Sequence, residues 1–344
     1  MGARGHLSFA PMAQFRVGID SYCLHPLKLA PGELLEWVAE SGGEGAQFSE
    51  VHMPPARALD EGFLRELAAD AQDRGMYLEW GGGQHVPFDT DTWQPKDLLP
   101  VNRRAAEQAH ILGARVIRSC SGGFFRWRDD APPTDDLVRE TAKALRAQRP
   151  LLEDLEVTLA IELHFEFTTF ELLRLFEMCD AEPGGWLGVC LDTFNMLPMA
   201  EEPVAGTERI LPWVVATHMK DGAVTLGPDG IITFPAQLGQ GIVDFPAILD
   251  RLTTLDRPVN LSLEDHGGEF TTPVCDASFL PRLPDLTVQE LGRLLRLAHL
   301  GGERLLSGEL APTDRADWPR LCTQRTEAGL ACLRQLVVEH TQHA

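Results

Sequence analysis

Short apolar runs alternate with amphipathic segments along most of this chain. Several of the runs are apolar throughout, which is typical of parallel strands that are buried on both faces. The pattern therefore predicts eight strands, at residues 15–22, 45–49, 77–81, 115–120, 158–163, 187–192, 214–219 and 259–264.

The segments between these runs have the period of amphipathic helices. In the first of them, Leu34, Leu35 and Val38 recur at helix spacing. Gly75 and Gly113 stand just after two later segments, where a left-handed residue commonly ends a helix. We predict helices at residues 31–41, 56–74, 100–112, 134–155, 169–179, 202–211 and 244–255.

Eight alternations of strand and helix favour a (β/α)8 TIM barrel. The alternative is a doubly wound sheet, which normally has a glycine-rich phosphate loop after the first strand, and the sequence DSYCLH at residues 20–25 contains no such loop. We assign residues 15–306 to the barrel, residues 1–14 to a flexible tail and residues 307–344 to an extra C-terminal helical extension.

Three later segments have patterns of their own. Residues 287–301 are expected to serve as the eighth barrel helix, and residues 315–340 to form an appended helix that packs on the barrel or on a second subunit. The appended helix is therefore also a candidate contact for a homo-oligomer. Residues 226–242 are rich in Gly and Pro, and we expect them to form one long active-site loop.

The charge of the chain limits the partners that it can bind, and its cysteine content indicates the redox state of its thiols. The chain has 51 acidic and 30 Lys or Arg side chains, a formal net charge of −21, and such a surface repels both nucleic acid and anionic lipid. The seven cysteines are odd in number and include no CxxC pair, which indicates reduced thiols. Residues 1–14 lack an apolar run of signal-peptide length, and no segment approaches the roughly 20 apolar residues of a membrane span. We expect a cytoplasmic protein that acts on a small molecule and contacts neither nucleic acid nor a membrane.

Polar residues collect where the predicted strands end, and those ends form the active-site face of a TIM barrel. Glu162, Asp192 and Glu264 each follow an apolar run, and His218 follows another. A buried carboxylate is costly unless it is paired or binds a metal. Three carboxylates and one histidine suit a divalent ion, and we expect Mn²⁺ first, with Mg²⁺ or Co²⁺ as alternatives. Strand two leads to Glu50, and six of the 11 histidines lie at or just past predicted strand ends: His25, His52, His85, His164, His218 and His266.

Five motifs together resemble the xylose-isomerase-like TIM-barrel superfamily of sugar isomerases and epimerases, over roughly residues 15–300. They are AIELH at 160–164, CLDTFN at 190–195, ATHMKDG at 216–222, GQGIVDFPAIL at 239–249 and LSLED at 261–265. The resemblance implies metal ligands at Glu162, Asp192, His218 and Glu264. It also implies that one of the two glutamates removes the proton next to the substrate carbonyl and that the other returns a proton to the opposite face.

The chain departs from the ketose 3-epimerases of that superfamily at three substrate-binding positions. Asn195 replaces the histidine of a DTFH motif, Thr168 replaces a second glutamate, and Val224 replaces an arginine. The metal ligands are kept while these substrate contacts differ, which weighs against simple ketose 3-epimerisation.

Further candidates for the site come from the same strand ends. His164, Lys220 and His266 are each two residues past a candidate ligand and are candidate acids or bases, although Lys220 could equally form an ion pair with Asp221 or Asp192. Candidate substrate contacts are His85, Arg118, Asn195 and Trp80. Arg118 could instead form a salt bridge inside the barrel, and Trp80, like Phe124 and Phe125, could be plain core.

Two reaction classes fit this set of residues. The first is a divalent-metal-dependent isomerase or epimerase that acts through an enediolate on a keto- or aldo-sugar, a sugar acid or a sugar phosphate. The alternative is a lyase on the same scaffold, such as a decarboxylase or dehydratase of a 3-oxo sugar acid or a C-glycoside-cleaving subunit. A non-catalytic sugar-binding protein is a more remote alternative, and the net charge of −21 argues against the endonuclease branch.

Overall fold

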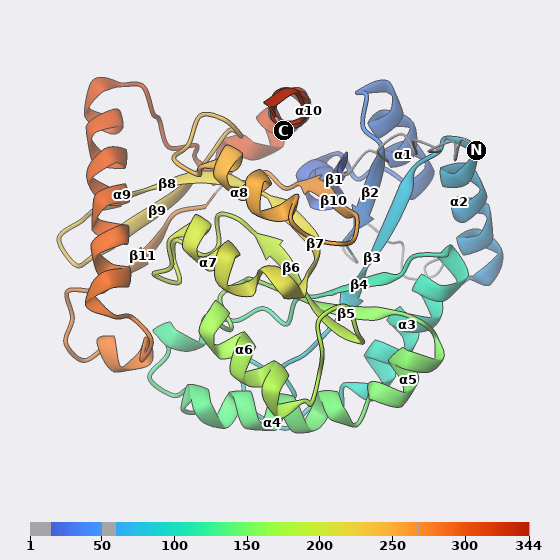
Figure 1. Cartoon of the computed structure of the whole chain (residues 1–344), viewed down its shortest axis with the longest axis horizontal. Helices are drawn as coiled ribbons and strands as arrows, with labels where there is room; N and C mark the ends of the chain where they lie inside the picture. The colour runs from blue at the N-terminus through green and yellow to red at the C-terminus, as the bar shows by residue number, and fades with distance from the viewer. Residues whose placement is uncertain (1–14, 50–59, 267, 344) are drawn as a thin grey trace, which may run out of the picture.

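The computed structural model describes residues 15–49, 60–266 and 268–343. Within these residues, eight parallel strands close into a barrel in the order β1-β10-β7-β6-β5-β4-β3-β2 (Figure 1). The predicted TIM barrel is confirmed. The expected tail at residues 1–14, and the strand-end candidates Glu50 and His52, lie outside the described residues. The barrel strands are β1 (Phe15–Asp20), β2 (Gly45–Phe48), β3 (Tyr77–Gly83), β4 (Val116–Ser119), β5 (Thr158–Glu162), β6 (Leu187–Asp192), β7 (Val214–Met219) and β10 (Val259–Leu263).

The inside of the barrel combines small apolar side chains with hydrogen-bonded polar ones. Ala160, Cys190 and Ala216 form a small buried cluster on neighbouring strands. Deeper polar residues satisfy one another, since Glu79 accepts hydrogen bonds from Gln47 (2.8 Å) and from Asn260 (2.8 Å). Because these polar groups are paired, their burial does not cost the free energy of an unmade hydrogen bond.

Helices cover the outside of the barrel. They are α1 (Pro31–Glu40), α2 (Glu61–Asp73), α3 (Leu99–Leu112), α4 (Thr134–Arg146), α5 (Arg149–Asp154), α6 (Thr169–Met178), α7 (Pro203–Ile210) and α8 (Phe245–Leu252). The single helix predicted for residues 134–155 is in fact α4 and α5, with a break before Pro150. Pro150 lacks the N–H that would bond the carbonyl of Arg146, so α4 ends there and α5 begins with this proline in its first turn.

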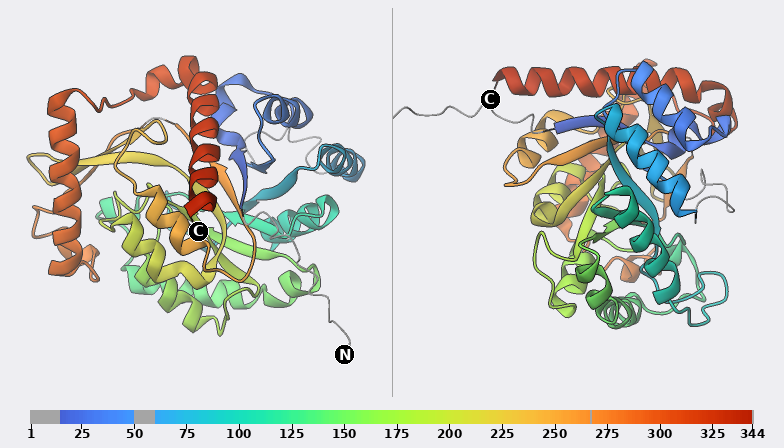
Figure 2. Two further views of the ribbon diagram at one scale, coloured as in Figure 1. Left: turned by 45° about the horizontal axis from the view of Figure 1, so that its top comes forward. Right: turned by 90° about the vertical axis from the view of Figure 1, so that its right-hand side faces the viewer.

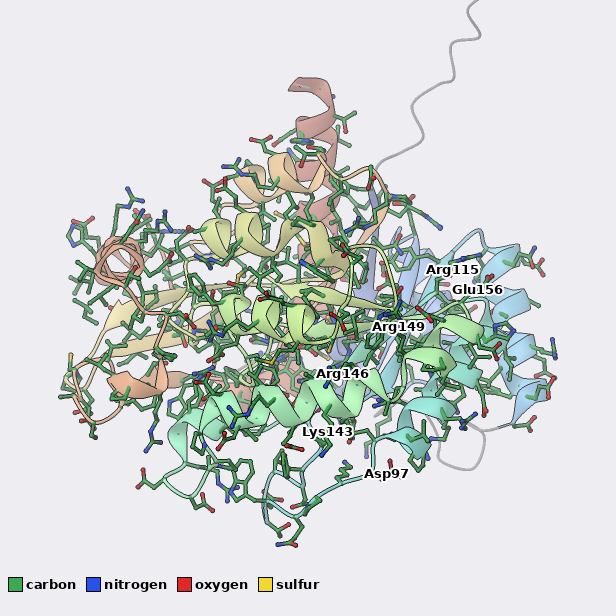
Figure 3. The ribbon with its side chains drawn as sticks, turned by 60° about the horizontal axis from the view of Figure 1, so that its bottom comes forward. Asp97, Arg115, Lys143, Arg146, Arg149 and Glu156 are labelled. Carbon is green, nitrogen blue, oxygen red and sulfur yellow. The ribbon has the colours of Figure 1, made fainter. Side chains whose placement is uncertain are left out.

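The outer surface around α4 and α5 is charged. Figure 3 shows Lys143, Arg146 and Arg149 projecting from these two helices, with Arg115 and Glu156 nearby. Arg115 Nη2 lies 3.9 Å from Glu156 Oε2, and the side chains of this pair are 80% and 73% exposed. Exposed pairs of this kind contribute little to stability, so this surface is best explained as solvation of the helix faces.

The region expected to be one long loop contains a strand, so that prediction was wrong. β8 (Asp221–Leu226) pairs in antiparallel fashion with β9 (Ile231–Ala236), and β9 pairs with β11 (Phe270–Thr272). The turn between β8 and β9 is GPDG at residues 227–230, closed by a hydrogen bond from Gly227 N to Gly230 O. A Gly-Pro-Asp-Gly turn between apolar runs is a hairpin signal, and its Gly and Pro content was mistaken for a loop.

The two C-terminal helices are present, but the expected role of the first one was wrong. α9 (Val288–Ser307) packs on β8, away from the barrel strands, and forms a second core with the small sheet (Figure 1). α10 (Trp318–His343) packs on β1, β10 and α8, which is the position of the eighth barrel helix (Figure 2). Gly301 permits close contact between α9 and β8, because a Cβ at that residue would lie 2.2 Å from Val224 O.

Among the described helices, none combines the length and the apolar character needed to cross a membrane.

Candidate active site

Four polar side chains meet at the carboxyl ends of neighbouring barrel strands. Glu162 and Asp192 are the last residues of β5 and β6. His218 is the penultimate residue of β7 and is in register with Asp192, while Glu264 directly follows β10. All four are buried, and one ligand atom from each lies within 4.8 Å of those of the others. The structure therefore brings together the four residues that the sequence proposed as metal ligands.

His218 is oriented for a ligand by Gln47. Its Nε2 lies 2.5 Å from Gln47 Oε1, and the amide nitrogen of Gln47 donates to Glu79 at 2.8 Å. Because Gln47 Oε1 can only accept, His218 Nε2 must donate to it. A metal binds the neutral ring, and in a neutral His218 the lone pair would then be on Nδ1. Nδ1 lies 3.3 Å from Glu162 Oε1 and 3.6 Å from Glu264 Oε1. A histidine ligand held by a second polar residue is the usual arrangement in metal sites.

Asp192 is oriented by the backbone that follows it. Its Oδ1 accepts hydrogen bonds from the N–H groups of Phe194 (2.9 Å) and Asn195 (2.8 Å). Asp192 Oδ2 and His218 Nδ1 are both buried, and neither has a hydrogen-bond partner in the part of the chain that the structure describes. Buried polar atoms are rarely left this way. A divalent ion among the four side chains would satisfy both atoms, so the residues present fit a metal.

The carboxyl groups have pKa values that reflect burial and nearby cations. Burial raises the pKa of Asp192 to about 7, against the opposing charge of Lys220, whose Nζ lies 3.9 Å away. Burial also opposes ionisation of Glu264, but Lys220 and His218 hold its pKa well below the ordinary value. The pKa of Glu162 is lowered in the same way by His218 and Arg118, which together outweigh its burial. A bound cation would favour the charged form of all three groups.

A pocket with a volume of about 260 Å³ opens over this cluster. It is a little smaller than the roughly 300–1,000 Å³ of sites for drug-sized ligands, so it suits a small substrate. Residues proposed from the sequence that line it are Arg118, Glu162, His164, Asn195, Lys220, Glu264 and His266. Its other lining residues include Tyr22, Ser49, Cys120, Phe124, Phe165, Phe270 and Arg315.

A sequence profile described as xylose isomerase-like TIM barrel matches residues 35–296. The chain belongs to this family. A 3-oxo-isoapionate decarboxylase of Pectobacterium atrosepticum is 28% identical over 242 residues, which cover 70% of this chain and 78% of the relative.

Solved structures of similar fold agree with this membership. The structure of an L-ribulose 3-epimerase matches with a TM-score of 0.56 and 20% identity, covering 86% of this chain and 95% of that chain. A xylose isomerase-like TIM barrel protein from Mycobacterium smegmatis in complex with magnesium matches with a TM-score of 0.56 and 14% identity, covering 82% of this chain and 97% of that chain. At these identities the structural likeness concerns the fold.

Two of the three positions at which this family member departs from the ketose 3-epimerase pattern have a structural role. Thr168 caps α6, where its Oγ1 accepts a hydrogen bond from Glu171 N at 3.3 Å and Glu171 accepts one from Thr168 N at 2.8 Å. Val224 is buried in β8 in the core beneath α9. Asn195 alone of the three lines the pocket.

The ammonium group of Lys220 contacts other strand-end residues and does not pair with Asp221. Its Nζ donates to Glu264 Oε2 at 2.8 Å and lies 2.6 Å from His266 Nε2. Asp221 instead accepts backbone hydrogen bonds from Gly222, Gly239 and Gly241 at 2.8–2.9 Å, so it holds the connection between β9 and α8. Of the two ion pairs that the sequence allowed for Lys220, the one with Asp192 forms at 3.9 Å, whereas Asp221 is bonded elsewhere.

Arg118 forms the salt bridge inside the barrel that was one of its two predicted roles, and it also lines the pocket. Its Nη1 donates to Glu162 Oε2 at 2.7 Å and its Nη2 donates to Ser49 Oγ at 2.9 Å. The guanidinium therefore orients one of the candidate ligands.

Two proposed substrate contacts do not reach the pocket. Trp80 lies in the core, where its indole N–H donates to Gln108 of α3 at 3.1 Å, because its side chain is on the helix side of β3. His85 is fully buried, bonds Ser119 through Nδ1 at 2.9 Å and packs against Phe167. Neither side chain is among the residues that line the pocket. His25 is also displaced from the cluster and stacks on Tyr22 with ring centroids 5.4 Å apart.

Sequence reasoning missed three buried polar residues at the site. Glu166 accepts a hydrogen bond from His164 Nδ1 at 3.0 Å, and Asp20 Oδ2 lies 3.4 Å from His218 Nε2. Asp20 ends β1, so the strand-end criterion would have found it had the strand not been extended to Tyr22. Gln47 is the polar residue of an otherwise apolar four-residue strand, which marks it as inward-facing.

Proposed function

We propose that this protein is a divalent-metal-dependent lyase that removes CO₂ from a 3-oxo sugar acid. The observation that carries the proposal is the pocket itself, in which three basic side chains, Arg118, Lys220 and Arg315, line the space over the four-residue cluster. Two of the three pair with Glu162 and Glu264, so among the described lining residues the basic side chains outnumber the acidic ones by one. In a chain with a net charge of −21, such a pocket favours an anionic substrate. The decarboxylase relative supports the same class.

The reaction places defined demands on the site. The bond between the carboxyl carbon and C2 breaks, its electron pair stays on C2 beside the 3-oxo group, and C2 then takes up one proton. Glu162, Asp192, His218 and Glu264 would hold a divalent ion, which when bound supplies a Lewis acid for the carbonyl oxygen. Arg118 and Lys220 keep two of these ligands ionised and oriented through contacts of 2.7 and 2.8 Å.

His164 is suited to deliver the proton to C2. It lines the pocket, and its Nδ1 is bonded to the buried Glu166 at 3.0 Å. That bond fixes the ring and leaves Nε2 as the nitrogen for the substrate. Burial lowers the pKa of His164, but Glu166 raises it further, so the net shift is upward and favours the protonated ring. A positioned acid of this kind typically contributes roughly 10²–10⁴-fold.

Isomerisation or epimerisation is the second candidate, supported by the fact that Glu162 and Glu264 line the same pocket. Two carboxylates could remove and return a proton beside a carbonyl. Each carboxylate is already paired with a cation, however: Arg118 donates to Glu162 at 2.7 Å and Lys220 donates to Glu264 at 2.8 Å, so neither is a free base. This is why decarboxylation, which needs no base to start, is preferred.

One experiment separates the two candidates. The protein is purified without a chelating tag, its metal content is measured, and it is incubated in D₂O with Mn²⁺ and either 3-oxo sugar acids or neutral ketoses. Decarboxylation predicts CO₂ release with one deuterium at the carbon that lost it. Epimerisation predicts exchange at a carbon beside the carbonyl without CO₂. Absence of both, with about one ion bound per chain, would refute both reactions and leave a binding protein.

A further inference from the structure

One wall of the pocket comes from outside the barrel. Arg315 lies in η6 (Arg315–Asp317), directly before α10, and lines the pocket together with Tyr22 and His266. Figure 2 shows α10 running along the barrel beside the first helix. Because Arg315 lines the pocket, the segment directly before α10 lies at the active-site end. The turn is closed by Asp314, whose side chain accepts a hydrogen bond from Ala316 N at 2.8 Å. The last segment of the chain is therefore part of the site.

Aromatic rings support Arg315 on this wall. Its Nη2 donates to the Tyr22 hydroxyl at 3.2 Å, and its guanidinium lies 6.0 Å from the centre of the Trp318 ring. The Tyr22 ring in turn lies 5.2 Å from Trp318 and 5.2 Å from His266. A guanidinium held near an aromatic ring keeps its positive charge, which is what the binding of a carboxylate requires.

A buried ion pair fixes this segment relative to the metal cluster. Arg325 of α10 binds both oxygens of Asp265 at 2.6 Å and also donates to Thr313 Oγ1 at 2.9 Å. Asp265 is the neighbour of Glu264 in the chain, and Thr313 is two residues before Arg315. The position of Arg315 is therefore set by the same strand end that presents a candidate ligand.

We propose that Arg315 is a specificity-determining residue that binds the carboxylate of an acidic sugar and so favours acids over neutral ketoses. This inference rests on the proposed function and names the group that the substrate presents. Arg118 and Lys220 hold Glu162 and Glu264 at 2.7 and 2.8 Å, so their charges are matched inside the cluster. A small acid with its carbonyl at the cluster would present its carboxylate to the rest of the pocket wall, to which Arg315 belongs.

The test compares binding of acids and of their neutral counterparts. D-Ribonate with ribitol, and D-arabinonate with D-arabinitol, are titrated calorimetrically into the Mn²⁺-loaded protein. The native protein is expected to bind each aldonate at least about tenfold more tightly than its alditol. Arg315→Gln should remove about tenfold to hundredfold of the aldonate affinity, which is the effect of one charged hydrogen-bonded contact, and leave alditol binding unchanged. Arg315→Lys should retain part of it.

The matched control is Arg320→Gln, since Arg320 is exposed on α10 and pairs only at the surface with Asp317 at 3.0 Å. It should leave every affinity unchanged. An unchanged aldonate preference in Arg315→Gln, or no preference in the native protein, would overturn the inference. If the native protein releases CO₂ and Arg315→Gln has an unaltered KM for the acid, the role of Arg315 is refuted while decarboxylation stands. Loss of the preference in Arg315→Gln without any CO₂ release by the native protein would refute decarboxylation and support acid binding.

Discussion

His218 Nε2 lies 2.5 Å from Gln47 Oε1, and this contact joins β7 to β2 across the inside of the barrel. It assigns the proton of the imidazole to Nε2 and turns Nδ1 toward Glu162 and Glu264, 3.3 and 3.6 Å away. A residue far from His218 in the sequence thus decides which nitrogen can bind a metal.

Gln47→Ala is expected to weaken metal binding about tenfold to hundredfold, because the histidine loses the partner that fixes its tautomer and ring orientation. Isothermal titration with Mn²⁺ measures the effect. Gln335→Ala, on the exposed face of α10, is the control and should bind as the native protein does. Equal affinity in both variants would mean that Gln47 does not orient the ligand.

Glu264→Gln should lower turnover at least about a thousandfold while the fold persists. The amide removes the charge of a candidate ligand and of the partner of Lys220. Steady-state CO₂ release and circular dichroism measure the two properties. Glu303→Gln provides the matched control, because Glu303 is 64% exposed on α9 and pairs only with His299. Near-native activity in Glu264→Gln would rule out the proposed site.

Glu166→Gln should lower kcat by roughly tenfold to a thousandfold with a smaller change in KM, because His164 loses the charged partner that holds it and favours its protonated form. Stopped-flow or coupled CO₂ assays give both constants. A fall in thermal stability with unchanged kcat would show that Glu166 serves packing alone.

Arg325→Met should destabilise the protein by about 3–5 kcal/mol, because it leaves the carboxylate of Asp265 buried without its cation. Arg65→Met is the comparison, since Arg65 and Glu61 form an ion pair whose side chains are 67% and 61% exposed, and its loss should cost under about 1 kcal/mol. Urea unfolding of the two variants measures the difference. Similar costs would mean that the buried pair is not what fixes α10.

Gly301→Ala should destabilise the protein by about 1–3 kcal/mol, because the added methyl group would lie 2.2 Å from Val224 O and push α9 from β8. Gly292→Ala, in the same helix, has nothing within 4 Å of the added atom and should stabilise by up to about 1 kcal/mol. Thermal unfolding of both variants provides the test. A stabilising Gly301→Ala would contradict the close packing of α9 on the small sheet.

The barrel strands and the four strand-end candidates could be predicted from the chain, because both signals are local. A strand of a parallel sheet is covered on both faces, so it is an apolar run at any position in the sheet. Closure of the barrel then brings the ends of consecutive strands together. Glu162, Asp192 and Glu264 each follow such a run, so their convergence required no knowledge of side-chain contacts.

Contacts between distant segments settled the rest. Three features depend on which of several similar surfaces pack together. They are the helix that completes the barrel, the partner of Lys220 and the pocket wall at Arg315. α9 and α10 are both amphipathic, and their sequence patterns do not state which sheet each apolar face will cover. Arg315 lies 293 residues from its hydrogen-bond partner Tyr22. Such a contact forms only when the chain has folded, so no local sequence pattern predicts it.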